Sequence, residues 1–336
     1  MEILNKIGSK LRREGKYLLR DVEHRIGLYN NFYSEARGNC IVIYHGICKE
    51  DHTRFNPIFL TKRTFEQHLK LYKKHFNVIS LDDFYQQKFS DKKFNICLTF
   101  DDGFANNYKY VLPLLEQYEI LATFFVTAIR DAGFDILWND FLGIVSKYGS
   151  DQIVFKDEPY RKGIHNKYIS TKTGISLVER LRSGGFAEKA EMMEVLYPLA
   201  PFKNNKHEKD YWLQMTTTQI KALSDSPFAS IGAHGYFHND LARIDIKDVK
   251  TELVDSKNYL ENIIQKPVNN LAFPYGSYTT EVVCAAKQTG YKQLLAMDFL
   301  FNNDVEDLSM RERFTVNPFI SANNQMYATV TKNYEH

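Results

Sequence analysis

The chain has 336 residues, of which 44% are hydrophobic and 25% charged, and its formal net charge is +2 at pH 7. This composition is typical of a globular protein and excludes a disordered or low-complexity chain. The near-neutral charge predicts no nucleic-acid partner, and no apolar run approaches the roughly 18 residues of a membrane span.

Residues 1–35 are predicted to form a basic amphipathic helix. Apolar side chains recur at helical spacing from Leu4 to Leu19, and Lys and Arg residues are interspersed up to Arg25. Such a helix either packs on the following domain or lies on an anionic membrane surface. Its charges do not fit a signal peptide, so we expect a cytoplasmic protein, with peripheral contact at the inner membrane face as the second alternative.

From residue 36 onward, short apolar runs alternate with segments of helical periodicity. Helices are predicted at 65–76 and 108–118, and strands at 40–44, 78–81, 96–100 and 122–126. Strands that alternate with helices in this way are typical of a parallel α/β architecture.

The alternation stops after Gly133. Residues 135–212 are richer in Lys, Glu and Tyr, and we predict a mainly helical insertion with helices at 175–181 and 187–196. The alternation then resumes, with helices expected at 216–223, 248–263 and 280–289 and strands at 230–234, 271–275, 293–297 and 314–317. The sequence therefore predicts one α/β barrel domain over 36–336 that is interrupted at 135–212.

Polar side chains recur where the predicted strands end. In α/β barrels the carboxyl ends of the strands converge on one rim, so these groups are expected to lie together. They are His45, Asp101, Asp102, His234, His238 and Tyr275.

Two adjacent carboxylates end the strand at 96–100. Asp101 and Asp102 precede Gly103, whose turn is able to bring both carboxylates to the rim. Buried charges are costly unless they are paired, and a bound cation is the simplest partner. His234 and His238 are spaced i, i+4, and we expect them on one face of a first helical turn.

Two imidazoles and one carboxylate make a three-ligand zinc site whose fourth position is open for water. The remaining aspartate is then free to act as a base, so the sequence predicts a metal-dependent hydrolase. Taken singly, aspartates before a glycine are also common turn formers, and paired histidines are often satisfied by backbone groups. Gly235 excludes the H-E-x-x-H arrangement of zincins.

These segments together resemble the polysaccharide deacetylase superfamily, carbohydrate esterase family four. The resemblance covers about residues 38–134 and 212–317. It rests on four short motifs in order, which are Tyr44-His45-Gly46, Thr99-Phe100-Asp101-Asp102-Gly103, His234-Gly235-Tyr236-Phe237-His238-Asn239 and Phe273-Pro274-Tyr275-Gly276.

The resemblance implies a distorted (β/α)7–8 barrel that removes an N-acetyl or related acyl group from an amino sugar. It implies that a divalent metal, usually zinc, is held by Asp102, His234 and His238, and that Asp101 is the general base. The backbone N–H of Tyr275 would help to stabilise the oxyanion. Substrate contacts are expected from Tyr44, Phe273 and Pro274.

Two departures from the family pattern stand out. The arginine that commonly orients the base aspartate is replaced by Ala272, and after His238 the only histidine is His336, so the usual catalytic acid is missing. His45 is our candidate for that acid, and a metal-bound water is the alternative. Other polar groups expected near the same rim are Asp298, Arg311 and Arg313.

A cytoplasmic deacetylase would meet a lipid-linked or nucleotide-linked precursor of a cell-surface polysaccharide, and a basic leader helix suits the lipid-linked form. One alternative is a deformylase or other amidohydrolase on the same scaffold. Another is a catalytically inactive glycan-binding module, which the missing arginine and histidine would allow.

Overall fold

A computed structural model describes residues 2–199, 201–204 and 206–334. Its centre is a nine-stranded sheet of parallel strands in the order β13-β12-β11-β10-β6-β5-β1-β14, with β4 paired to β5 beside this path. The strands are β1 (Asn39–Tyr44), β4 (Asn77–Val78), β5 (Asn95–Phe100), β6 (Ala122–Val126), β10 (Ala229–Ala233), β11 (Asn270–Ala272), β12 (Gln293–Leu295), β13 (Met310–Arg311) and β14 (Phe314–Thr315).

The two ends of this sheet are neighbours in the sequence. Only Glu312 and Arg313 separate β13 at one edge from β14 at the other. The Arg313 N–H donates to the Met297 carbonyl at 3.0 Å, and the Val316 N–H donates to the Ile43 carbonyl at 3.1 Å. The segment 310–316 therefore draws the sheet into a ring, which confirms the predicted distorted barrel.

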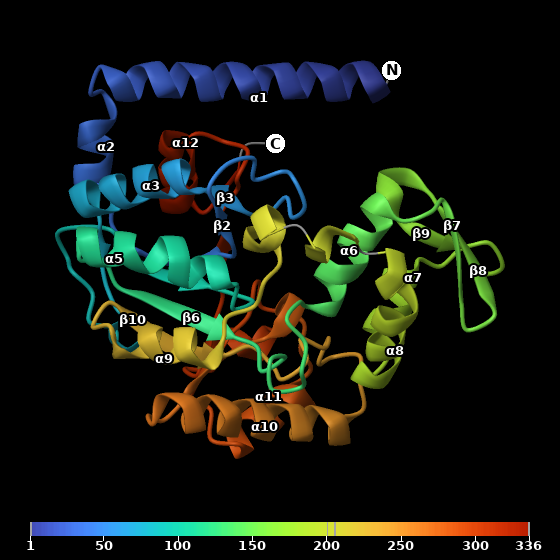
Figure 1. The fold of residues 1–336 in the computed structure, drawn as a ribbon. Helices are drawn as coiled ribbons and strands as arrows, with labels where there is room; N and C mark the ends of the chain where they lie inside the picture. The colour runs from blue at the N-terminus through green and yellow to red at the C-terminus, as the bar shows by residue number, and fades with distance from the viewer. Residues whose placement is uncertain (1, 200, 205, 335–336) are drawn as a thin grey trace.

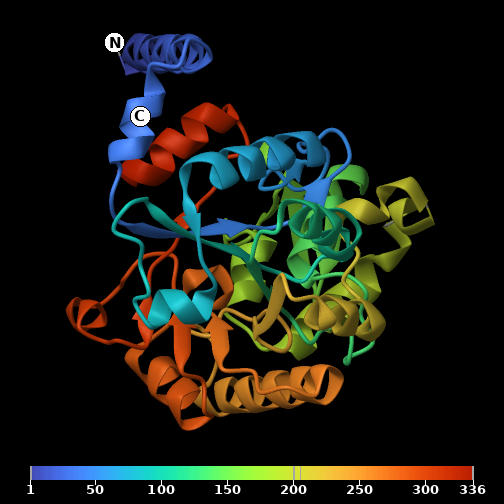
Figure 2. The ribbon, with the colours of Figure 1, turned by 90° about the vertical axis from the view of Figure 1, so that its left-hand side faces the viewer.

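Helices pack around the outside of the curled sheet (Figures 1 and 2). Several of them present an apolar stripe to it, as α10 does with buried Val249, Leu253 and Leu260. A smaller apolar cluster, which includes Phe125 and Leu295, is separate from the main core between the helices and the sheet. The helices are α3 (Lys62–His75), α4 (Leu81–Tyr85), α5 (Leu112–Tyr118), α9 (Thr217–Asp225), α10 (Ile246–Ile264), α11 (Thr280–Gln288) and α12 (Ala322–Thr331).

Short elements complete this part of the chain. A π-helical turn over Asn107–Val111 precedes α5, and two residues each form β2 (Ile47–Cys48) and β3 (Leu60–Thr61), which pair with one another. A 3-10 turn over Pro274–Gly276 follows β11, which is why the strand expected to reach residue 275 ends at Ala272.

The insertion stands at one side of the barrel (Figure 1), and its apolar side chains form a second core cluster together with Cys48, Phe59 and Phe104 of the barrel. It contains α6 (Trp138–Tyr148), α7 (Leu177–Arg182) and α8 (Phe186–Leu196), together with an antiparallel sheet of β7 (Gln152–Phe155), β8 (Glu158–Lys162) and β9 (Tyr168–Ser170). The prediction of a mainly helical insertion missed this sheet. The β7–β8 turn uses Lys156 and Asp157, both at positive φ, and lacks the Asn-Gly or Asp-Gly pair that marks such turns in a sequence.

The N-terminal region forms two helices instead of the one expected over 1–35. Helix α1 (Glu2–Arg25) ends before Gly27, which adopts a φ of 82°, and α2 (Tyr29–Glu35) turns toward the barrel. Figure 2 shows α1 standing above the body of the molecule. Within the described residues, no helix combines the length and apolarity needed to cross a bilayer.

Candidate metal centre

Three of the predicted ligands meet at the carboxyl ends of neighbouring strands. Asp102 follows β5, and His234 and His238 follow β10. The Nε2 atoms of His234 and His238 lie 3.4 and 3.3 Å from Asp102 Oδ1, and the side chains are all buried. This is the only group of at least three His, Cys, Asp or Glu ligands found in the described part of the chain.

The spacing of these donor atoms fits a tetrahedral metal ion. Ligand atoms that lie about 2.0–2.1 Å from a zinc ion at tetrahedral angles are separated from one another by about 3.3–3.4 Å. The two Nε2-to-Oδ1 distances have this value. Two nitrogens and one carboxylate oxygen also form the donor set of catalytic zinc sites that keep an open position.

Unusual backbone conformations bring the ligands together. Asp102 and Gly103 both have positive φ (74° and 79°), so the chain reverses sharply after β5. A Cβ on Gly103 would lie 2.9 Å from a Val126 side-chain carbon, which favours glycine there. Gly235 and His238 also have positive φ, so the segment that carries the two histidines, residues 234–240, folds back on itself.

The expected helical turn for the histidine pair is wrong. Residues 234–240 form an irregular loop between β10 and α10. The two imidazoles approach each other because left-handed residues fold the loop back, with their ring centroids 5.1 Å apart.

The protonation of the ligands suits a cation. His234 Nδ1 lies 2.8 Å from the Ala272 carbonyl oxygen, which only accepts hydrogen bonds, so Nδ1 carries the proton and Nε2 presents its lone pair. Burial alone would raise the pKa of Asp102, but its interactions with His234 and His238 hold the pKa well below its usual value. Asp102 is therefore an ionised carboxylate facing two imidazole nitrogens.

Asp101 has a separate partner. The Arg313 guanidinium donates two hydrogen bonds to its carboxylate, Nη1 to Oδ1 at 2.7 Å and Nη2 to Oδ2 at 2.8 Å. The arginine side chain is fully buried and also donates to Thr99 Oγ1 at 3.2 Å. Burial by itself raises the pKa of Asp101, but the charge and hydrogen bonds of Arg313, together with the interactions with His234 and His45, outweigh it, and the net shift is downward.

His45 and Tyr275 flank the ligands. His45 interacts electrostatically with Asp101 and Asp102, while burial lowers its pKa. The Tyr275 ring lies 4.7 Å from that of His238, and its backbone is left-handed, with φ 61° and ψ 7°. Its hydroxyl is buried and has no hydrogen-bond partner within the described structure.

The residues expected to contact substrate lie mostly in the core. Consecutive strand residues face opposite sides, so Tyr44 points away from His45, and its hydroxyl lies 2.9 Å from His68 Nδ1 and 2.7 Å from the Tyr72 hydroxyl. Phe273 is buried in the main apolar core, where its ring stacks on that of Tyr278. These contacts contradict a substrate role for the Tyr44 and Phe273 side chains.

Pro274 is also buried, directly before Tyr275, and so belongs to the turn that carries the tyrosine. Of the polar groups expected near the rim, only Arg313 reaches the site. Arg311 instead donates to the Leu308 carbonyl and stacks on the Tyr85 ring, and it lines a cavity of about 490 Å³ together with Asp298.

Sequence reasoning missed an acidic group from the insertion. Asp140, in the first turn of α6, has one buried carboxylate oxygen without a partner, and its other oxygen accepts from Asn56 at 3.3 Å. Burial, reinforced by the charge of Asp102, raises the pKa of Asp140 well above its usual value. No motif marks this residue, because it reaches the rim only through the packing of the insertion.

Comparison with known proteins gives one family and a set of similar structures. The family model described as Polysaccharide deacetylase matches residues 88–136 and 198–294. The Bacillus subtilis protein YxkH, which carries a polysaccharide deacetylase name, is 20% identical over 256 residues. That match covers 75% of this chain but only 62% of YxkH.

Similar solved structures include the Streptococcus pyogenes deacetylase PplD in complex with acetate, with a TM-score of 0.55 and 18% identity over 86% of this chain and 97% of that one. IcaB from Ammonifex degensii gives a TM-score of 0.52 and 16% identity over 88% and 97% of the two chains. At these identities the comparison shows a shared fold.

Proposed function

Because the chain belongs to the polysaccharide deacetylase superfamily, we propose that it is a metal-dependent hydrolase that removes an N-acetyl or related N-acyl group from an amino sugar. The substrate would be a cell-surface polysaccharide or its lipid-linked or nucleotide-linked precursor. The observation that carries the proposal is the buried Asp102–His234–His238 cluster beside Asp101, an ionised carboxylate that is not part of the cluster.

Asp102, His234 and His238 would hold the metal, for which zinc is the first candidate. When bound, a divalent ion supplies Lewis acidity toward water and the acyl carbonyl. Asp101 is the group that accepts the proton from the attacking water, and Arg313 keeps that carboxylate ionised and fixes its orientation. The backbone N–H of Tyr275 would donate to the developing oxyanion, an interaction worth roughly 3 kcal/mol.

The leaving amine needs a proton, and we propose that His45 supplies it. It follows β1 at the same rim and interacts with both aspartates. Replacing His45 with Gln is expected to lower kcat by about 10²- to 10⁴-fold, because a general acid contributes on that scale. Steady-state kinetics on zinc-loaded protein measure this change, and zinc content reports whether the centre is intact. Full turnover by the variant would rule out the acid role.

The decisive experiment combines metal analysis with product detection. Purified protein is analysed for bound metal, and acetate and formate are measured after incubation with a panel of amino-sugar glycans and precursors. Acetate release that a chelator abolishes and zinc restores supports the proposal. Formate release in its place identifies a deformylase, and bound zinc without any acyl release identifies a glycan-binding module.

We also propose that α1 contacts the cytoplasmic face of a membrane. Its side toward the body is anchored to α12, where Arg20 donates to Asn324 at 2.7 Å and Asp21 accepts from Ser321 at 2.7 Å. Apolar residues along the helix remain exposed, at Leu11 (68%), Leu18 (69%), Leu19 (58%) and Val22 (46%). The Leu4 and Ile7 side chains, which were expected on this stripe, lie outside the described residues.

An anchored helix with an exposed apolar stripe and many basic residues suits the interface of an anionic bilayer. We expect the protein to co-sediment with vesicles that contain phosphatidylserine at low salt, and to be released as salt screens the attraction. The Leu11→Asp/Leu18→Asp variant should lose this binding. Val154→Asp, at an exposed position on the insertion sheet, is the matched control. Equal binding by all three proteins would contradict a role for α1.

A further inference from the structure

We infer that the insertion at 135–212 positions the metal ligand His238, and that the affinity for zinc depends on contacts made by the insertion. This inference rests on the proposed metal centre. It assigns the insertion a role at the centre itself, through four side chains that contact the loop at 234–240. They are Trp138, Arg182, Phe186 and Lys189.

The ligand loop needs outside support because neither helix nor sheet holds its second half. After β10 ends at Ala233, residues 234–240 are irregular, and Gly235 and His238 have positive φ. From the barrel side, Glu252 of α10 accepts hydrogen bonds from the backbone N–H groups of Tyr236 (3.1 Å) and Phe237 (3.3 Å). Beyond Phe237, Glu252 also accepts a hydrogen bond from the Asn239 side chain.

The insertion contacts the ligand residue directly. The indole Nε1–H of Trp138, at the start of α6, donates to the backbone carbonyl of His238 at 3.1 Å. Trp138 is fully buried, so this bond is shielded from water. A hydrogen bond to the carbonyl of a left-handed residue helps to fix the peptide plane and, through it, the direction of the imidazole.

The insertion also holds the next residue. The buried ammonium of Lys189, on α8, donates to Asn239 Oδ1 and to the Gly184 carbonyl. Asn239 in turn donates to Glu252. The same side-chain amide is therefore hydrogen-bonded to a lysine of the insertion and to a glutamate of the barrel. Because leaving a buried charge unpaired is costly, this network strongly specifies the position of Asn239.

Two further contacts complete the support. The Arg182 Nε donates to the buried carboxylate of Asp240 at 3.0 Å, and its guanidinium lies 4.4 Å from the centre of the Tyr275 ring. The ring of Phe186 stacks on that of Phe237, with centroids 4.1 Å apart. Residues 237–240 are therefore each contacted by a different side chain of the insertion.

The test is the zinc affinity of the full-length protein, measured by competition with a chromophoric chelator. Trp138→Phe removes the indole N–H, and Lys189→Met removes the ammonium. Outer partners of metal ligands typically contribute 10- to 100-fold to affinity, so each variant is expected to bind zinc at least about 10-fold more weakly. The visible spectrum of the cobalt-loaded protein provides a second readout of ligand geometry.

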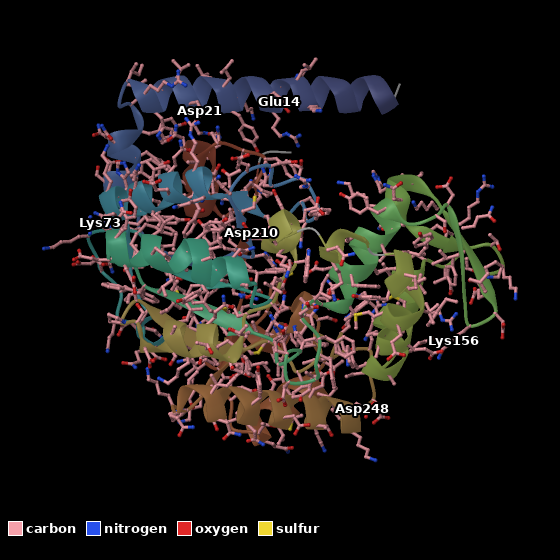
Figure 3. The ribbon with its side chains drawn as sticks, in the orientation of Figure 1. Glu14, Asp21, Lys73, Lys156, Asp210 and Asp248 are labelled. Carbon is pink, nitrogen blue, oxygen red and sulfur yellow. The ribbon has the colours of Figure 1, made fainter. Side chains whose placement is uncertain are left out.

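Lys156→Met is the matched control, because Lys156 also belongs to the insertion but pairs with Glu191 on its outer part (Figure 3). It should bind zinc like the wild type. Thermal unfolding of the metal-free proteins identifies a variant that fails to fold. If one of the two variants fails to fold, the zinc affinity of the other tests the inference. Unchanged affinity and cobalt spectrum in a folded Trp138→Phe or Lys189→Met protein would overturn the inference while leaving the proposed function intact. A wild type that binds no zinc would overturn both.

Discussion

Asp101→Asn is expected to lower kcat by about 10²- to 10⁴-fold, because the amide retains the shape of the side chain but cannot accept the proton from water. Zinc content should not change, since the three proposed ligands remain. Acetate release and metal analysis on the same preparation measure both quantities. Turnover within a few-fold of the wild type would exclude Asp101 as the base.

Stability must be separated from chemistry in this variant. The substitution leaves the buried Arg313 guanidinium without its anionic partner, and breaking such a pair typically costs about 3–5 kcal/mol. The double variant Asp101→Asn/Arg313→Met removes both charges and should recover much of the lost stability. Its turnover should remain as low as that of Asp101→Asn, because the base is still missing.

Arg313→Met is expected to shift the acidic limb of the activity profile to higher pH. The base must be ionised, so activity falls as the pH drops through its pKa. Burial raises the pKa of Asp101 and Arg313 lowers it, so without the arginine the carboxylate is protonated at higher pH than in the wild type. The pH dependence of kcat/KM on zinc-loaded protein reports this shift.

The neighbouring Arg311 provides the control for this prediction. It belongs to the same segment but bonds to the Leu308 carbonyl and contacts the Tyr85 ring, so Arg311→Met should leave the acidic limb unchanged. Arg313→Lys keeps a positive charge without the bidentate geometry and should give an intermediate profile. An unshifted limb in Arg313→Met would show that this arginine does not set the ionisation of the base.

The sequence was most informative where burial dictates residue type. The strands that carry Asp102 and His234 are apolar runs that end in polar residues, and their alternation with helices predicts a parallel sheet whose strand ends converge. The residue pattern alone therefore suffices to assign the three proposed metal ligands to one rim. The histidine loop was predicted in the right place but with the wrong conformation, since positive φ at His238 has no sequence signal.

The sequence predicted that Arg313 lies near the rim, but it did not predict that Arg313 pairs with Asp101. Arg313 is separated from Asp101 by 212 residues and lies in a short segment without a motif. Its role depends on the ring closure that brings β14 beside β1, which periodicity does not reveal. The expectation that Tyr44 contacts substrate has a different problem. The motif associated it with His45, whereas strand alternation places its ring in the core with Phe65 and Phe100.

The segment that carries Arg313 and closes the ring is one of the last parts of the barrel to be synthesised. A growing chain acquires both aspartates and both histidines long before residues 310–316 leave the ribosome. Until that segment joins β12 to β1, the Asp101 carboxylate has no guanidinium to hold it in position. Under the proposed mechanism, the general base is fixed in its working orientation only once the ring has closed.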